Sequence, residues 1–151
     1  KKTAEIRNPG ATRPWQHVLE PLGGYLTLGA LLEVNENING QAYNFGPPAD
    51  QNHSVIELIS EMQKHWRNVD WKDISNDEKY HEAGLLKLNC DKALFDLNWN
   101  PTLSFNETVR FTAEWYKAFY DAETKDMLEF SNNQIDEYVN IAREKNISWA
   151  R

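Results

Sequence analysis

Three segments of the sequence pair a serine with a glutamate or glutamine three positions later, just before apolar residues at helical spacing: Ser54/Glu57, Ser104/Glu107 and Ser131/Gln134. This pattern predicts a helix start, because the serine hydroxyl and the acidic or amide side chain satisfy free N–H groups of the first turn. After Ser54, apolar residues recur at steps of four, three and four. We therefore predict a chain dominated by helices.

The remaining segments predict shorter elements. Residues 4–16 contain turn and proline signals and are expected to be extended or looped. A helix is expected from position 17 or 18, with Leu22 and Leu26 on one face and with small residues that allow close packing at Gly23 and Gly24. A short helix is expected near 91–97, a buried strand at 42–47 and an exposed strand at 69–74. Two or three short strands cannot complete a sheet alone, so they require a partner sheet.

Composition limits the classes of function. The chain has 151 residues, of which 40% are hydrophobic, and it carries six residues each of Trp, Tyr and Phe, enough for one aromatic-rich core. A net charge of −7 disfavours nucleic acid as a partner. The single cysteine, Cys90, excludes an internal disulfide and fits a reducing compartment. With no membrane-spanning stretch and no signal peptide, the chain is expected to be cytoplasmic.

Motifs for several kinds of chemistry are missing from the sequence. There is no Gly-x-Gly-x-x-Gly loop for a dinucleotide, no Tyr-x-x-x-Lys pair and no Gly-x-Ser-x-Gly elbow. The four histidines do not fall at metal-ligand spacing, so we expect no metal site. By elimination, the chain is predicted to bind or pack against something, with no catalytic residue of its own.

The segment from Ile6 to Val18 holds the most informative group of residues. Arg7, Arg13 and His17 lie on a loop that precedes a helix, and a guanidinium can grip a diphosphate with two hydrogen bonds. A lone arginine is more often part of an ion pair, and for His17 a structural role and a binding role are both open.

The sequence of this segment resembles the extended short-chain dehydrogenase/reductase family of sugar-nucleotide epimerases and dehydratases, and within it the CDP-glucose 4,6-dehydratases. The likeness rests on Arg-Asn-Pro-x-Ala-Thr-Arg-Pro-Trp-Gln-His-Val-Leu-Glu-Pro-Leu-x-Gly-Tyr-Leu over 7–26. Further matches follow in order at 43–47, at 81–88 and at Leu97-x-Trp99-x-Pro101. Pro14, Gly84 and Asn89 depart from the family pattern.

The resemblance implies roles for individual residues. Arg13 would contact the substrate diphosphate, while the cytosine would lie near Glu5, Ile6 and Arg7. Glu82, with His81 beside it, would reach the ribose, and His17 is kept as a further candidate for substrate binding.

The resemblance also implies the fold and the activity. We expect an α/β protein, of which residues 1–151 form the mostly helical, C-terminal, sugar-nucleotide-binding portion, without the N-terminal NAD-binding Rossmann portion. The parent would be an NAD-dependent lyase that removes water from CDP-glucose, and it would form a homo-oligomer. Two alternatives stay open: another sugar-nucleotide epimerase or dehydratase, or a non-catalytic binding module derived from one.

Overall fold

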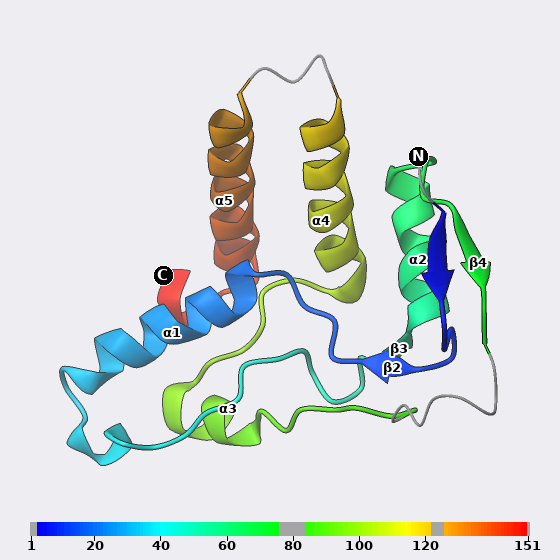
Figure 1. Cartoon of the computed structure of the whole chain (residues 1–151). Coiled ribbons are helices and arrows are strands. Elements are labelled where there is room, and N and C mark those ends of the chain that lie inside the picture. The colour runs from blue at the N-terminus through cyan, green and yellow to red at the C-terminus, as the bar shows by residue number, and fades with distance from the viewer. Residues whose placement is uncertain (1–2, 76–83, 122–125, 151) are drawn as a thin grey trace.

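The computed structural model describes residues 3–75, 84–121 and 126–150 (Figure 1). Helices predominate, as predicted, and the strands are only two or three residues long. In chain order the elements are β1 (Ala4–Ile6), β2 (Thr12–Arg13), α1 (Leu19–Leu32), η1 (Glu36–Ile38), β3 (His53–Ser54), α2 (Val55–His65), β4 (Trp71–Asp73), α3 (Asp91–Leu97), α4 (Phe105–Tyr120), α5 (Met127–Glu144) and η2 (Ser148–Ala150).

The strands form two small sheets. β1 pairs in parallel with β4, with Ala4 opposite Trp71, and β2 pairs antiparallel with β3, with Arg13 opposite His53. The predictions of an extended segment at the beginning and of a strand within 69–74 are confirmed. Sheets of this size contribute little stability by themselves, so they depend on the helices around them.

The strand predicted at 42–47 is wrong for the described structure. This segment has no regular secondary structure and belongs to neither sheet. Side-chain hydrogen bonds, rather than pairing with a strand, hold this segment. Gln16 Nε2 donates to the Phe45 carbonyl at 3.0 Å, and Asn44 Nδ2 donates to the Asn89 carbonyl at 3.1 Å. Apolar alternation predicted the burial of Phe45 correctly, but it cannot supply a strand for the segment to pair with.

Two of the three predicted capping boxes are present. Ser54 and Glu57 cap α2, and Ser104 and Glu107 cap α4, each with the serine hydroxyl accepting from the N–H three residues later. α2 and α4 pack against each other, and α5 packs on α4 (Figure 1).

The third predicted box, at Ser131 and Gln134, is wrong because α5 begins earlier. Asp126 is its N-cap and accepts from the N–H groups of Leu128 and Glu129 at 2.9 and 3.0 Å. Ser131 therefore lies inside the helix, and buried Gln134 donates to the Phe111 carbonyl at 2.9 Å. Aspartate caps a helix as well as serine does, so a second Ser-x-x-Gln pattern inside a helix can mislead.

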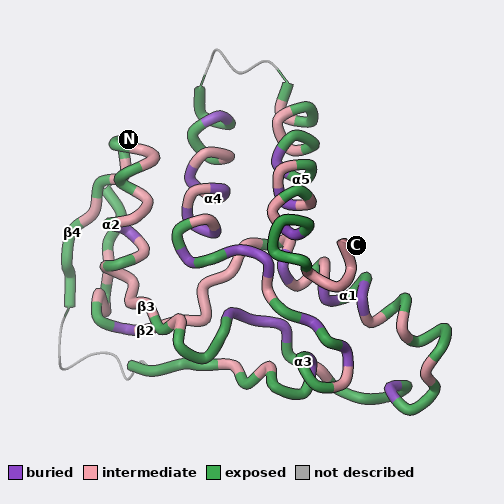
Figure 2. The backbone as a smooth tube through the Cα atoms, turned by 180° about the vertical axis from the view of Figure 1, so that it is seen from behind, coloured by how far each residue is buried: buried purple, intermediate pink, exposed green. Residues whose placement is uncertain are grey.

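Two groups of buried apolar side chains form the core. Figure 2 marks the buried positions along the backbone in purple. Leu103, Phe111 and Tyr138 lie between α4 and α5. The other group joins α3 and the segment after it to the region that follows α1. Its buried members are Ile38, Phe45, Ala93, Leu97 and Trp99.

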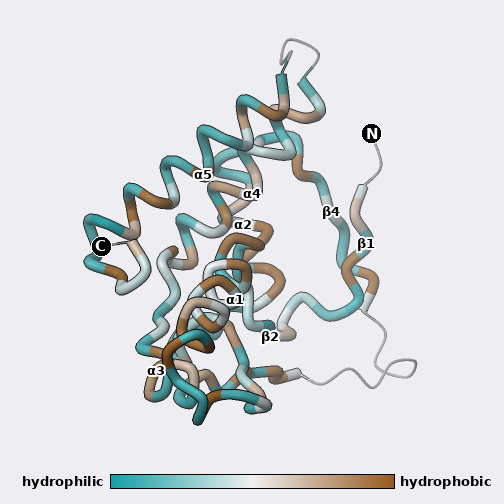
Figure 3. Tube along the Cα trace, turned by 90° about the vertical axis from the view of Figure 1, so that its left-hand side faces the viewer, coloured by the Kyte–Doolittle hydropathy of each residue, from teal (hydrophilic) through white to brown (hydrophobic). Residues whose placement is uncertain are grey.

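Helix α1 turns an unexpected face inward. Leu22 and Leu26, on its predicted apolar face, are 46% and 76% exposed, whereas Glu20, Gly24 and Thr27 are buried. α1 is apolar along much of its length, while α5 is largely hydrophilic (Figure 3). On the inward side of α1, the buried side chain of Phe45 packs against Gly24.

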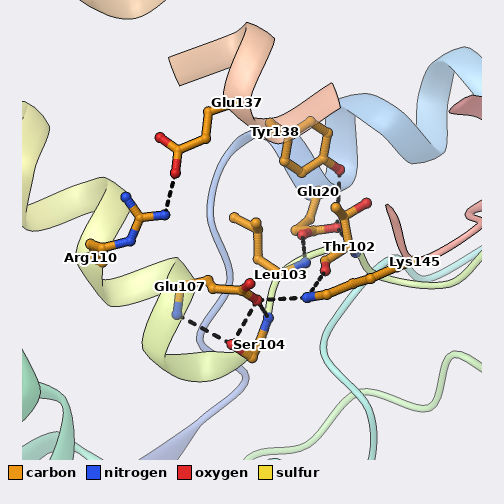
Figure 4. Close-up of polar contacts among 9 residues, drawn as sticks. All are labelled: Glu20, Thr102, Leu103, Ser104, Glu107, Arg110, Glu137, Tyr138 and Lys145. Carbon is orange, nitrogen blue, oxygen red and sulfur yellow. Dashed lines mark hydrogen bonds and ion pairs between the residues drawn. The ribbon is translucent and has the colours of Figure 1, made fainter. Parts of the chain in front are cut away.

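The carboxylate of Glu20 ties α1 to the loop before α4 and to α5 (Figure 4). It accepts from the N–H groups of Thr102 and Leu103 at 2.9 and 2.7 Å, and from the hydroxyl of Tyr138 at 3.2 Å. Burial raises the pKa of the Glu20 carboxyl, and these three donors oppose that rise. This connection fixes the start of α1, and with it the direction of the loop that carries Arg13.

Candidate functional site

The loop that carries the predicted arginines is held against the beginning of α2. The carbonyls of Pro9 and Ala11 accept from the N–H groups of Ile56 and Val55, both at 3.0 Å. Ala11 is 1% exposed. Because the first turn of a helix has N–H groups without helical partners, these carbonyls both cap α2 and fix the loop.

β2 lies between two other segments. On one side Arg13 and Thr12 pair with β3, and the indole Nε1 of Trp15 donates to the His53 carbonyl at 2.8 Å. On the other side the Thr12 N–H donates to the Gly84 carbonyl at 2.8 Å, and Thr12 forms a parallel bridge with Leu85. Residues from three separate stretches of sequence thus meet at β2.

The side chain of Arg13 is half-buried at the edge of a small hollow. Its Nη1 donates to the Thr12 carbonyl at 2.8 Å. The hollow encloses about 10 Å³ and is also lined by Gln51, Asn52 and Lys87. That volume holds about one water molecule.

A larger groove of about 440 Å³ adjoins this hollow. The two share Lys87 and residues 47–49, and the groove continues past Cys90 to Trp99. Lys87 Nζ donates to the Ala49 carbonyl at 3.1 Å. Two cations and two amide side chains therefore border the hollow, a set of donors suited to an anionic group. Of these four, only Lys87 also lines the groove, where Asp91 is the acidic residue.

The predicted site residues on β1 and at its end do not line the hollow at Arg13. Glu5 Oε1 lies 2.7 Å from Lys72 Nζ on β4, and the Ile6 carbonyl accepts from the Ile74 N–H at 2.9 Å. Arg7 follows β1 and is exposed. The structure thus groups Glu5, Ile6 and Arg7 along one strand and its end.

His17 lines a different cavity from Arg13. This cavity, of about 410 Å³, lies between the start of α1, α4 and α5 and includes Trp115 and Tyr116. The Nδ1 of His17 accepts from the Leu19 N–H at 3.4 Å, and its ring meets Phe111 edge-on at 5.6 Å. Burial lowers the pKa of His17. The structure does not bring His17 to the hollow at Arg13.

His81 and Glu82 lie outside the described residues, so their predicted contact with a ribose stays a prediction. Gly84, the first described residue after them, is the one bonded to Thr12.

Three polar residues at the hollow were not predicted: Gln51, Asn52 and Lys87. Lys87 falls within the matched segment 81–88, so its charge was a usable signal, but nothing in the sequence around Gln51 and Asn52 marks them. Cys90 is half-buried, and burial raises the pKa of its thiol, which disfavours the reactive thiolate.

Two further features of the described residues concern metal ions and membranes. No three or more histidine, cysteine, aspartate or glutamate side chains among them gather at a possible metal site. None of their helices combines the length and the apolar character needed to cross a bilayer.

Comparison with known proteins relates the chain to enzymes that act on sugar nucleotides. It is 36% identical over 135 residues to CDP-glucose 4,6-dehydratase of Salmonella typhimurium, a match that covers 89% of this chain and 37% of that protein. The chain therefore spans little more than a third of that relative. No family model matches it.

Solved structures show the same fold. UDP-glucuronic acid 4-epimerase from Bacillus cereus, in complex with UDP-glucuronic acid and NAD, aligns with a TM-score of 0.64 at 21% identity, over 79% of this chain and 36% of the other. UDP-glucose 4-epimerase from Stenotrophomonas maltophila, with bound NAD and formylated UDP-arabinopyranose, gives 0.63 at 18% identity, over 78% and 35%.

Proposed function

We propose that this chain forms the nucleotide-sugar-binding portion of a CDP-glucose 4,6-dehydratase, an NAD-dependent lyase, because it is similar in sequence to such a dehydratase and in fold to a sugar-nucleotide epimerase. The observation that carries the proposal is the 36% identity that extends over 89% of the chain. The position of Arg13 beside segment 84–88 gives it physical support, since two of the matched segments meet there.

In this proposal Arg13 and Lys87 bind the diphosphate of the substrate. The small hollow holds only about one water, so the diphosphate would lie where the hollow opens into the adjoining groove. The guanidinium offers a fork of donors, and the ammonium adds a second positive charge. Following the family resemblance, Glu5, Ile6 and Arg7 border the cytosine, and His81 and Glu82 lie toward the ribose.

The described residues do not fit NAD. Apart from the single parallel bridge between Thr12 and Leu85, parallel pairing among them is confined to β1 and β4. β1 leads through residues 7–10 into β2 rather than through a glycine-rich turn into a helix. A dinucleotide site needs such a turn, with the pyrophosphate at the helix N-terminus. We therefore place the cofactor and the catalytic residues outside this chain, and we expect the chain alone not to convert CDP-glucose.

Binding specificity separates this proposal from its alternatives. An epimerase or dehydratase for another nucleotide would prefer a different base, as the UDP sugars in the related structures illustrate. Calorimetric titration of the chain with CDP-glucose, UDP-glucose and dTDP-glucose distinguishes them. We expect CDP-glucose to bind most tightly, and equal affinities would contradict the cytidine assignment.

The role of Arg13 is tested in the same titration. Arg13→Gln should weaken CDP-glucose binding roughly tenfold or more, because charge-assisted hydrogen bonds to the diphosphate are lost, and Arg13→Lys should recover part of it. Arg143→Gln, a matched change at an exposed arginine on α5, should leave the affinity unchanged. If Arg13→Gln behaves like Arg143→Gln, Arg13 does not hold the substrate.

Two further parts of the proposal concern the protein's setting. A cytoplasmic location rests on the single cysteine, which fits a reducing compartment. Homo-oligomer formation rests on the exposed apolar side chains of α1.

A further inference from the structure

Most of the basic side chains in this acidic protein are already engaged. Lys72, Lys92 and Lys145 form ion pairs, and Arg110 bridges two glutamates. Among the lysines and arginines in the described ranges 3–75, 84–121 and 126–150, two show no hydrogen bond or ion pair: Arg67 and Lys117. These two residues line the same groove.

This groove lies between the ends of two packed helices. Arg67 follows the end of α2 by two residues, and Lys117 lies in the last turn of α4. The groove has a volume of about 1020 Å³, large enough for a nucleotide-sized molecule. It shares no lining residue with the hollow at Arg13.

Aromatic rings and further polar groups line the same groove. The rings of Trp66 and Tyr120 lie nearly parallel, 17° apart with centroids separated by 5.9 Å, and Tyr120 is 68% exposed. The amide of Asn68 is beside them. Lys64 also lines the groove but is paired with Glu61, and Asp121 is the acidic residue in the lining.

We propose that this groove binds a small molecule that joins a phosphate to a planar ring, such as a nucleoside monophosphate. Arg67 and Lys117 would bind the phosphate, and the ring would pack on the exposed part of the Tyr120 side chain. Two unpaired cations beside an aromatic face match the two halves of such a ligand. The inference is independent of the function proposed for Arg13.

The alternative explanation for these two cations is a structural one, namely that they stabilise the ends of the helices. The carbonyls at a helix C-terminus carry partial negative charge, which a lysine in the last turn offsets. This accounts for Lys117 but not for Arg67, which lies beyond the end of α2. It also does not account for a groove of this size that is lined by aromatic rings.

The test follows the indole N–H signal of Trp66 by NMR, identified with Trp66→Phe, while CMP or inorganic phosphate is added to the chain. We expect a saturable shift with both, and CMP should bind roughly fivefold or more tightly, because a base that stacks on an aromatic ring adds affinity. The double variant Arg67→Gln/Lys117→Gln should weaken CMP binding roughly tenfold or more. Because both side chains lie at the protein surface, its thermal unfolding should match that of the unmodified chain.

Matched variants separate this groove from other anion sites. Arg143→Gln should leave the Trp66 response unchanged, and so should Arg13→Gln, because neither residue lines the groove. The proposal is overturned if millimolar CMP leaves the Trp66 signal unmoved, if the double variant binds as tightly as the unmodified chain, or if Arg13→Gln abolishes the shift.

Discussion

A carboxylate oxygen of Glu20 lies 2.7 Å from the backbone nitrogen of Leu103, 83 positions further along the chain. Glu20 is 1% exposed and accepts two backbone N–H groups and one phenol. In the sequence, Glu20 stands in the matched segment 7–26 and has no obvious role there. In the structure it joins α1 to the loop that leads into α4.

We predict that Glu20→Gln destabilises the fold by about 1–3 kcal/mol. The amide nitrogen of glutamine cannot accept a hydrogen bond, so one buried N–H of Thr102 or Leu103 loses its partner. Urea unfolding gives the change in free energy. Glu33→Gln, an exposed position at the end of α1, is the matched control and should change stability by less than about 0.5 kcal/mol. Equal stabilities for the two variants would contradict the role given to Glu20.

A second prediction compares two glycines of α1. A Cβ added at Gly24 would lie 2.4 Å from Cδ1 of Phe45, whose side chain is buried, while a Cβ at Gly29 meets no atom within 4 Å. Gly24→Ala should therefore destabilise the protein by about 1–3 kcal/mol through overpacking. Gly29→Ala should stabilise it by about 0.5–1 kcal/mol, because alanine favours a helix. Thermal unfolding of both variants measures these changes in stability. A change of the same sign in both variants would contradict the close packing at Gly24.

Local signals in the sequence predicted much of this fold. The capping boxes at Ser54 and Ser104 start α2 and α4, because capping depends only on residues three positions apart. The signal at Ser131 failed because Asp126, an equally good cap, lies upstream in the same helix. The prediction of a strand at 42–47 failed because strand pairing requires a neighbouring strand, which local sequence does not reveal.

The candidate site was predicted only in part. The run from Arg7 to His17 singled out Arg13, which does lie where separate segments meet. His17, four residues later, was grouped with it, yet the chain turns into α1 and carries His17 into another cavity. Gln51 and Asn52 reach the hollow through the pairing of β2 with β3, which sequence spacing does not encode.

The pH dependence of stability should report the burial of His17. Burial lowers its pKa in the folded protein below the usual value near 6.5. As the pH falls below that value, the unfolded chain binds a proton that the folded protein does not, so the free energy of unfolding falls. We expect the free energy of unfolding, measured with urea, to fall more between pH 7.5 and pH 5.5 in the unmodified protein than in the His17→Gln variant. Parallel losses in the two proteins would show that His17 does not contribute.

The exposed apolar face of α1 should make the isolated chain self-associate. Leu26 is 76% exposed and Val18 is 62% exposed, and contiguous apolar surface of this kind favours contact between molecules. Burying one leucine stabilises a contact by about 1.5–3 kcal/mol, so Leu26→Lys should weaken self-association roughly tenfold or more in sedimentation equilibrium. Asn133→Lys, which adds the same charge at an exposed position of α5, should have a much smaller effect. A chain that stays monomeric at high concentration would contradict the prediction, and equal effects of the two lysines would assign the association to charge rather than to this face.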